Sequence, residues 1–403
     1  MTHNWKRWLA PGAAITAAAV LAACSSSSTS SSSSAPATSS SPAASTSASA
    51  SASGAASSTT DAGLAKAQQM VSQLESTTSS YPVPTASISG VSGLKGKTVY
   101  YIPLVQFIPG FVVTAATMKV ALAKVGLNLQ VCNGQGQPSA IASCVQQATG
   151  AGAAGIITDA IPYGMAQNAL DAAKAKGIPI IITDQYPPAG NKNTDAVTYV
   201  PGVVDQPSQI AWWMIANSQG KANAILAQES DSPSSIAYVQ NSLSIYKDNC
   251  PGCTVTVKSI TATTNSQLAS DTSANLLSNP NATYYYTEFE DSLDPTVQGL
   301  QQSNKTDIAL SVAGGSVDGL GRLKSGAVVK AVVAVDQAYA GWALTDEILR
   351  MATKAAPVAE PFPSRLFTAQ NIGSIKVTTA AQASGEWFGD SSYQTDFAKL
   401  WGV

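Results

Sequence analysis

Histidine is almost absent from this chain, because His3 is the only one among 403 residues. His3 also lies within the first 23 positions, which we expect to be removed as a signal peptide. Without histidine there can be no Ser-His-Asp triad, no Cys-His pair and no imidazole-bound zinc. Enzymes built on Asp, Glu, Lys or Tyr remain possible, but none of their recurring motifs appears. We therefore expect no catalytic residue and no metal site.

Features that bind phosphate or nucleic acid are also lacking. The sequence contains no P-loop, and Gly134-Gln135-Gly136 lacks the third glycine of a dinucleotide-binding fingerprint. Charged residues make up only 11% of the chain, and removal of Lys6 and Arg7 with the signal peptide would leave 20 basic against 24 acidic residues. The resulting formal charge of −4 offers no basic field for nucleic acid. We expect no cofactor and no nucleic-acid partner.

The N-terminus has the order of a secretory signal. Lys6 and Arg7 precede an apolar run at 13–20, which is too short to span a membrane comfortably. Leu21-Ala22-Ala23-Cys24 follows and resembles the bacterial lipobox, in which the cysteine is lipidated and becomes the first residue of the mature protein. The alternative is an ordinary signal peptide followed by a chance cysteine. We expect Cys24 to anchor the chain at the outer face of the cell membrane, with no other membrane contact.

A structureless tether is expected at 24–60. After Cys24, residues 25–60 are only Ser, Thr, Ala, Pro and Gly, which cannot form a core. As a random coil the segment would hold its ends roughly 30–36 Å apart. An untethered tail would explain the composition but not its place after Cys24.

Four cysteines remain if Cys24 is lipidated, and export favours disulfides. Three pairings are possible, and we favour Cys132–Cys144 with Cys250–Cys253. The first would contribute around 3 kcal/mol by closing a short loop. Cys250-Pro251-Gly252-Cys253 superficially resembles a redox motif, but it follows a helical stretch and precedes a strand, whereas a thioredoxin-like motif opens a helix. A structural disulfide is the favoured interpretation.

The chain then divides into a lead-in and a compact part. Residues 61–77 have apolar side chains at steps of three and four, which predicts a short amphipathic helix. Tyr81-Pro82-Val83-Pro84 ends it, so 61–93 reads as a short helix and an extended lead-in. About 310 residues follow from Leu94, enough for two ordinary domains.

Apolar runs of strand length alternate with helix-length segments in two consecutive series. The strands are continuously apolar, as expected when helices cover both faces of a parallel sheet. This predicts an α/β protein with two doubly wound parallel-sheet lobes. The pair Trp212 and Trp213 fits core packing better than ligand stacking. The expected strands are 98–105, 127–132, 155–158, 178–183 and 196–200, then 224–227, 254–260, 283–287, 308–312 and 328–335.

Several strand openings resemble one family. Lys95-Gly96-Lys97-Thr98-Val99-Tyr100-Tyr101-Ile102-Pro103 and Gly177-Ile178-Pro179-Ile180-Ile181-Ile182-Thr183-Asp184 look like type I periplasmic binding proteins, and so do 128–132 and 154–159. The resemblance runs from residue 94 to about 403 and is closest to the ribose- and galactose-binding lipoproteins of ABC importers.

That resemblance implies the type I periplasmic-binding-protein fold, with two lobes joined by a three-strand hinge. The crossings should fall near 199–202, 335–337 and 363–366. The N-terminal lobe is then expected at 94–201 plus 337–363, and the C-terminal lobe at 202–336 plus 364–403. The ligand would lie in the cleft between the lobes, at the carboxyl ends of their strands.

The family's pocket motifs transfer only in part. Its Asn-Pro-Phe-Phe corresponds to Phe107-Ile108-Pro109-Gly110-Phe111, and its Asp-Arg to Asp184-Gln185, while its second-lobe arginine falls near Ala237-Tyr238. Both sugar-gripping arginines are therefore missing. Each implied residue could instead cap the next helix. The ligand-binding residues implied are Gln106, Phe107, Phe111, Asp184, Gln185, Glu288, Phe289 and Asp336.

The expected function is that of a monomeric, lipid-anchored solute-binding protein of an ABC importer, which passes a small polar, sugar-like solute to a permease. Alternatives are a sensing role beside a membrane kinase, a nucleoside or amine ligand, and an extracellular enzyme on the same fold. The polar residues at or just past the strand ends include no Lys or Arg, which predicts a neutral or cationic ligand. They are Gln106, Asn133, Asp159, Asp184, Gln185, Glu229, Asp231, Glu288, Glu290 and Asp336.

Overall fold

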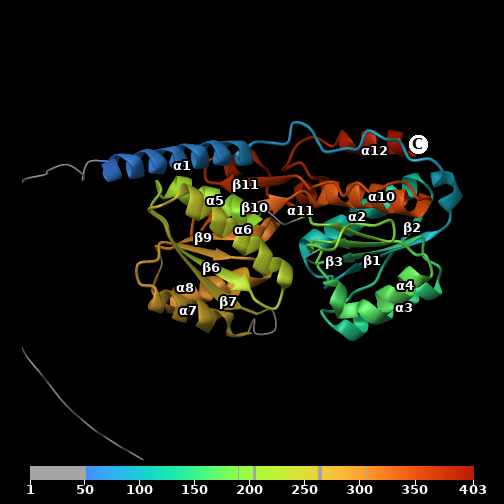
Figure 1. Cartoon of the computed structure of the whole chain (residues 1–403), viewed down its shortest axis with the longest axis horizontal. Coiled ribbons are helices and arrows are strands. Elements are labelled where there is room, and N and C mark those ends of the chain that lie inside the picture. Colours follow the sequence, from blue (N-terminus) through green and yellow to red (C-terminus); the bar gives the residue numbers. More distant parts are fainter. Residues whose placement is uncertain (1–50, 189, 203–205, 262–265, 306) are drawn as a thin grey trace, which may run out of the picture. The chain divides into compact units, whose positions relative to one another are not determined.

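The computed structural model describes residues 51–188, 190–202, 206–261, 266–305 and 307–403 (Figure 1). The predicted signal peptide, Cys24 and the tether as far as residue 50 lie outside these ranges. None of the helices in the described ranges combines the length and apolar character that a membrane crossing needs.

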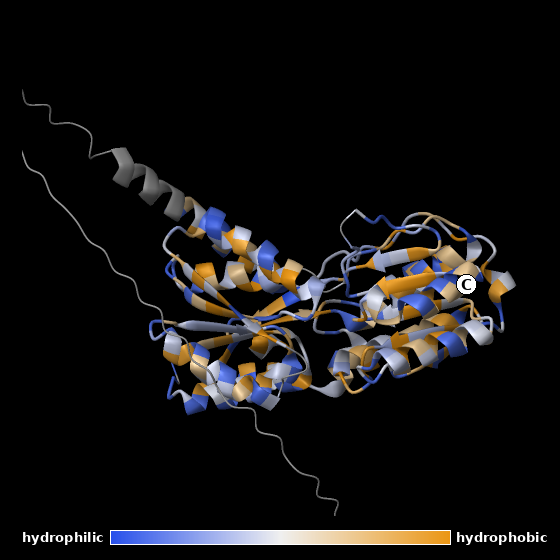
Figure 2. Ribbon diagram, turned by 60° about the horizontal axis from the view of Figure 1, so that its bottom comes forward, coloured by the Kyte–Doolittle hydropathy of each residue, from blue (hydrophilic) through white to orange (hydrophobic). Residues whose placement is uncertain are grey.

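The first lobe is built on a five-stranded parallel sheet in the order β2-β1-β3-β4-β5. Its inner strands are buried, apart from Thr98 at the start of β1, because helices cover both faces. Figure 2 shows the same pattern as hydrophobic strands between helices of mixed colour. The elements are β1 (Thr98–Pro103), α2 (Pro109–Lys124), β2 (Asn128–Val131), α3 (Pro138–Gly150), β3 (Gly155–Asp159), α4 (Gln167–Ala175), β4 (Ile180–Thr183) and β5 (Val197–Val200).

The second lobe has a six-stranded sheet in the order β11-β10-β9-β8-β6-β7. Its strand pairs are parallel except β10 with β11, which is antiparallel and lies at the edge. The two predicted βα series are thus confirmed as two doubly wound lobes. The elements are α5 (Gln206–Asn217), β6 (Asn223–Glu229), α6 (Pro233–Asn249), β7 (Thr254–Ile260), α7 (Leu268–Ser278), β8 (Tyr284–Thr287), α8 (Leu293–Gln302), β9 (Ala309–Gly314), α9 (Val317–Ser325), β10 (Val329–Val335) and β11 (Ser364–Thr368).

The chain passes between the lobes at the three places that the resemblance implies. It leaves β5 for α5, leaves β10 for α10 (Gln337–Thr353), which packs on α2, and returns to the second sheet at β11. Two side chains come very close to the backbone at the first crossing. A Cβ on Gly202 would lie 2.1 Å from the Phe362 ring and 2.8 Å from Asp184 Oδ1, so only glycine fits there.

The C-terminal helix packs on the first lobe, which corrects the predicted boundary of the second lobe at 364–403. Tyr393, Phe397 and Trp401 recur every four residues along α12 (Tyr393–Trp401) and are all buried in the first lobe's core. Trp401 stacks on Trp342 of α10, with ring centroids 5.5 Å apart. This aromatic stripe fits the surface of α10, and α10 belongs to the first lobe.

The N-terminal helix is longer than predicted. α1 spans Ser51–Glu75 and so begins ten residues before Asp61, within the segment predicted to be structureless. Extending a formed helix adds a hydrogen bond with each residue and needs no new nucleus, and alanine favours that extension. α1 packs on α5 of the second lobe, where Ala67 is fully buried.

Residues 76–93, here called the N-terminal strap, continue from α1 to the first lobe. Ile88 and Val91 are buried in the first lobe's core. Tyr81 lies between α1 and Ile88 along the strap. It donates a 3.2 Å hydrogen bond to Asp336 Oδ2 and stacks on Tyr339 with ring centroids 5.4 Å apart. The strap therefore runs alongside the hinge and contacts both lobes.

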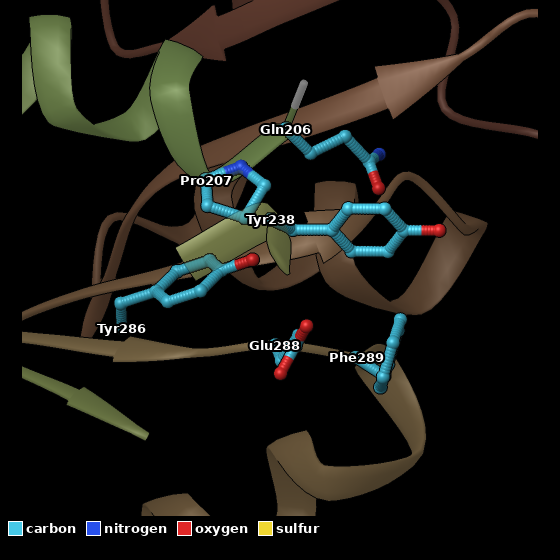
Figure 3. Close-up of a pocket in the computed structure, with 6 residues that line it drawn as sticks. All are labelled: Gln206, Pro207, Tyr238, Tyr286, Glu288 and Phe289. Carbon is cyan, nitrogen blue, oxygen red and sulfur yellow. The ribbon is translucent and has the colours of Figure 1, made fainter. Parts of the chain in front are cut away.

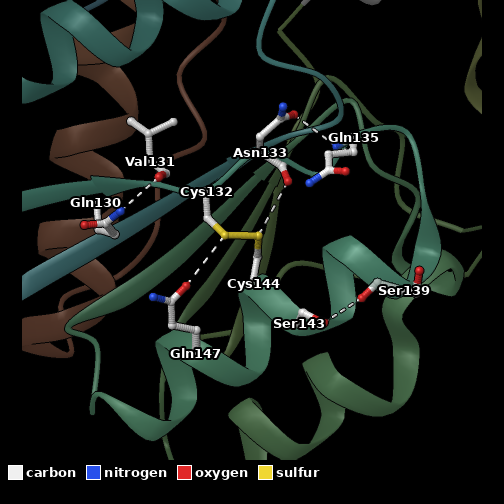
Figure 4. The surroundings of a disulfide bond; sticks show 9 residues. All are labelled: Gln130, Val131, Cys132, Asn133, Gln135, Ser139, Ser143, Cys144 and Gln147. Atoms are coloured by element: carbon white, nitrogen blue, oxygen red, sulfur yellow. Dashed lines mark hydrogen bonds between the residues drawn. A yellow bond between two sulfur atoms is a disulfide. The ribbon is translucent and has the colours of Figure 1, made fainter. Parts of the chain in front are cut away.

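Two disulfides join Cys132 to Cys144 and Cys250 to Cys253, the short-range pairings favoured from the sequence. The first links the end of β2 to α3, and Figure 4 shows Gln147 and the Asn133 carbonyl beside its sulfur atoms. The second lies between α6 and β7. Neither disulfide crosses between the lobes, because the first lies within the first lobe and the second within the second lobe.

Candidate functional site

Each sheet reverses its strand order at one point, and these points define the candidate site. The reversal falls between β1 and β3 in the first lobe and between β6 and β8 in the second. In doubly wound sheets the crevice outside the carboxyl ends of the strands at such a point is where ligands bind. Asp159 ends β3, Glu229 ends β6, and Glu288 directly follows β8.

Two carboxyl groups meet on the first lobe's wall. Asp159 accepts a 2.5 Å hydrogen bond from the Tyr101 hydroxyl and shares another with the Asp184 side chain. Burial raises the pKa of Asp159 above its usual value, against the opposing effect of these hydrogen bonds and of the Ala160 backbone N–H. Asp184 has a φ of 58°, a left-handed conformation that is uncommon outside glycine. This backbone turns the chain directly after β4, at the edge of the crevice.

A small pocket lies on the second lobe's wall (Figure 3). It is formed by the ends of β8 and the first turns of α5 and α6, and aromatic rings make up half of its lining. In this conformation the pocket has no room for a whole solute. The lining residues are Gln206, Pro207, Tyr238, Tyr286, Glu288 and Phe289.

Glu288 is fixed at one oxygen and unpartnered at the other. Its Oε2 accepts hydrogen bonds from Ser235 Oγ at 2.5 Å and from the Glu229 N–H at 3.0 Å, whereas Oε1 is buried without a partner. Burial raises the pKa of Glu288 to about 7, although both hydrogen bonds oppose the shift. The Tyr286 hydroxyl is also buried and unpartnered. Buried polar atoms normally have partners, so these two mark a place for a ligand group.

The lobes touch across this region. Tyr238 Oη donates to the Asp184 carbonyl at 2.9 Å, and Ser234 Oγ donates to Gln185 Oε1 at 2.9 Å. The Tyr186 N–H donates to Ser234 Oγ at 3.1 Å, and the Tyr186 and Tyr238 rings lie 5.1 Å apart. The loop after β4 thus rests on the first turns of α6.

The structure groups some of the sequence-predicted ligand residues and separates others. Glu288 and Phe289 line the pocket, while Asp184 and Gln185 lie at the contact between the lobes. The remaining four differ in setting. Phe111 is buried in the first turn of α2, Gln106 and Phe107 are exposed, and Asp336 is fully buried in the hinge.

Asp336 acts as the N-cap of α10 in this structure. Its Oδ1 accepts from the Tyr339 N–H at 3.0 Å, and its Oδ2 accepts from Tyr81. Glu290 has a similar role, because its carboxylate accepts the N–H groups of Gly315 and Ser316 ahead of α9. For these two residues the helix-cap alternative describes the observed contacts.

Sequence reasoning did not single out four of the pocket residues, namely Gln206, Pro207, Tyr238 and Tyr286. A signal was present for Tyr286, which lies two residues before Glu288 and so shares its face of the strand. Tyr238 stands near the position where the family's arginine was sought. In this chain it bonds to the backbone of the opposite lobe.

A family model described as a periplasmic binding protein domain matches residues 99–356, which covers more than half of the chain and both lobes. The chain belongs to this family. This is a family of binding proteins and not of enzymes. No curated protein sequence matches the chain at a significant level.

Solved structures with the same fold come from several bacteria. The 5-methylthioribose transporter solute-binding protein of Thermotoga lettingae is 14% identical over 75% of this chain and 98% of its own, with a TM-score of 0.61. The Caulobacter myo-inositol-binding protein is 19% identical over 73% and 98%, with a TM-score of 0.59. A glucose-galactose-binding protein of Geobacillus stearothermophilus is 13% identical over 69% and 99%, with a TM-score of 0.60. At these identities the likeness concerns the fold.

Proposed function

We propose that this protein is a lipid-anchored, extracytoplasmic solute-binding protein of an ABC importer. It captures a small polar, sugar-like solute between its lobes and passes it to a permease. The observation that carries the proposal is the set of carboxyl groups at the strand-order reversals of both lobes, on the fold of this family. The ligands named for its structural neighbours, 5-methylthioribose, myo-inositol, glucose and galactose, are all small and rich in hydroxyl groups.

The cleft residues suit such a ligand. Carboxylates accept hydrogen bonds from hydroxyl groups, and the amide of Gln185 can both donate and accept. The aromatic rings at Tyr238, Tyr286 and Phe289 can cover the apolar face of a sugar ring. Asp184 and Glu288 face the same region from opposite lobes, so one solute could engage both and hold the lobes together.

A thermal-shift panel of sugars, polyols, nucleosides and amines, followed by calorimetry, tests the proposal. A ligand at about 100 times its dissociation constant should stabilise the protein by about 2.7 kcal/mol. Asp184→Asn and Glu288→Gln should each weaken binding at least tenfold. Asp248→Asn, an exposed acid-to-amide change on α6, should leave binding unchanged. Tight binding that neither cleft substitution alters would contradict the proposed site.

Anchoring through Cys24 needs a separate test. Cys24→Ala should move the protein from the membrane fraction to the soluble fraction and leave its ligand affinity unchanged. A variant that stays membrane-bound through detergent-free washing would rule out the lipid anchor but not the binding function.

A further inference from the structure

The second-lobe pocket gathers acidic side chains around two unpartnered polar atoms. Glu288 Oε1 and the Tyr286 hydroxyl are both buried and unpartnered, and both belong to its lining (Figure 3). Glu288 is only 1% exposed and Tyr286 is fully buried. Because Ser235 and the Glu229 backbone fix the other Glu288 oxygen, Oε1 has a defined position. The two atoms are independent signs of a missing ligand group.

The charges that act on this pocket are acidic. Glu229 is half-buried beside Glu288, and burial, then the charges of Glu288, Asp291 and Asp231, raise its pKa to about 8. Ion pairs within the described ranges join other acids, Asp171, Asp294, Asp318, Asp346 and Asp396, to lysine or arginine. A desolvated carboxylate beside other acids is costly unless a positive group approaches it.

We propose that the second-lobe pocket binds the protonated amine of a small hydroxylated solute, such as an amino sugar or an amino polyol. Glu288 Oε1 accepts a hydrogen bond from the ammonium group, and the Tyr286 hydroxyl accepts a second. Glu229 adds negative charge as the cation draws off its proton, and the rings of Tyr238 and Phe289 line the same pocket. The hydroxyl groups of the solute lie toward Asp184 and Gln185 on the other lobe. This inference rests on the proposed function and names its substrate class.

An ammonium group suits the pocket better than a hydroxyl group for a reason of charge. A hydroxyl can satisfy Oε1 but leaves the carboxylate charge of Glu288 beside Glu229. An ammonium group satisfies the same atom and also neutralises one charge. Binding should therefore draw a proton off the Glu288–Glu229 pair, because a nearby cation favours the ionised carboxylate.

The experiment uses matched pairs that differ only in the amine. Calorimetry at pH 7 would compare glucosamine with glucose, galactosamine with galactose, and glucamine with glucitol. We expect at least one amine to bind tenfold or more tightly than its neutral partner. Titrations in two buffers of different ionisation enthalpy should show that binding of the amine releases a proton, whereas binding of its neutral partner does not. Glu288→Gln should remove both the preference and the proton release, and Asp248→Asn should change neither.

The other outcomes overturn the inference. Equal or tighter binding of the neutral members would refute it and leave the proposed function standing. Binding of no member in the wider sugar and polyol panel would overturn both. Stabilisation by Ca²⁺ or Mg²⁺ that Glu288→Gln abolishes would assign the pocket to a metal ion instead. If Glu288→Gln does not fold, Glu229→Gln must reduce the amine preference, and failure to do so also refutes the inference.

Discussion

Glu288 couples the pocket to the pH dependence of stability. An unfolded glutamate titrates near 4.5, whereas burial raises the pKa of Glu288 to about 7 in the folded protein. Between these values the folded state holds a proton that the unfolded state lacks. The contribution to the free energy of unfolding is therefore complete below pH 4.5 and is lost as the pH rises through 7.

We predict that the ligand-free protein loses stability between pH 5 and pH 8, and that Glu288→Gln flattens this decline. The shift corresponds to about 3 kcal/mol at most. Glu229 and Asp336, whose raised pKa values are about 8 and about 7, add to the slope, so the flattening should be partial. Urea unfolding at several pH values measures the effect, with Asp248→Asn as control. Identical slopes in the wild type and Glu288→Gln would contradict the assigned environment.

At the scale of elements, substitutions in α12 test whether this helix completes the core of the first lobe. Trp401 is buried against Trp342 and donates a 2.7 Å hydrogen bond from its indole N–H to Asp346 Oδ1. Trp401→Ala should cost about 3–5 kcal/mol in the free energy of unfolding. Trp401→Phe keeps an aromatic ring but removes the donor, so its cost should be smaller. Denaturant unfolding gives both values, and a near-neutral Trp401→Ala would mean that α12 does not complete this core.

The two disulfides should contribute differently to the free energy of unfolding, because they close loops of different length. Cys132 and Cys144 are 12 residues apart, whereas Cys250 and Cys253 are 3 apart. By the chain-entropy relation, replacing the first pair by serine should cost about 3 kcal/mol, and replacing the second about 1.5–2 kcal/mol. Thermal unfolding of the two double variants compares them directly. The opposite order would show that the second disulfide has a role beyond loop closure.

The helices and strands were largely predictable from the sequence, but the elements against which each of them packs were not. A continuous apolar run such as Ile180–Thr183 predicts both that the segment is a strand and that the strand is buried on two faces. The aromatic stripe of α12 predicts a buried helix face, but nothing local says which lobe covers it. The same limit applies to the site. Glu288 and Asp184 are visible as acids after strands, but Tyr238 enters the pocket only because α6 packs beside α5 and β6 in the second lobe.

At the scale of the whole molecule, the strap should restrain the movement of the lobes. Tyr81 bonds to Asp336 at the hinge, while α1 and Ile88 hold the two ends of this segment on different lobes. Tyr81→Phe keeps the stacked ring and removes that bond. We predict a larger radius of gyration for the ligand-free variant than for the wild type in small-angle scattering, and a smaller one for both proteins when ligand is bound.

Tyr163→Phe provides the control for this measurement. Tyr163 donates its hydroxyl to Asp171 within the first lobe, and so its loss should not affect the hinge. A profile of Tyr81→Phe that matches the wild type and Tyr163→Phe would show that the strap follows the lobes without restraining them. A profile unchanged by saturating ligand would argue against closure about the hinge.

The interleaving of the lobes along the chain also has a consequence for the order of assembly. Val99 at the start of β1 and Trp401 in the last helix belong to one core, and the second sheet gains its edge strand only at β11. During synthesis the first lobe cannot be completed before α12 leaves the ribosome, and the second sheet cannot be completed before β11 does. Such distant pairings carry a large loop-closure cost and slow the search for the native state. The protein should therefore remain incompletely folded until residues 393–401 have been made, a state compatible with the export of an unfolded chain.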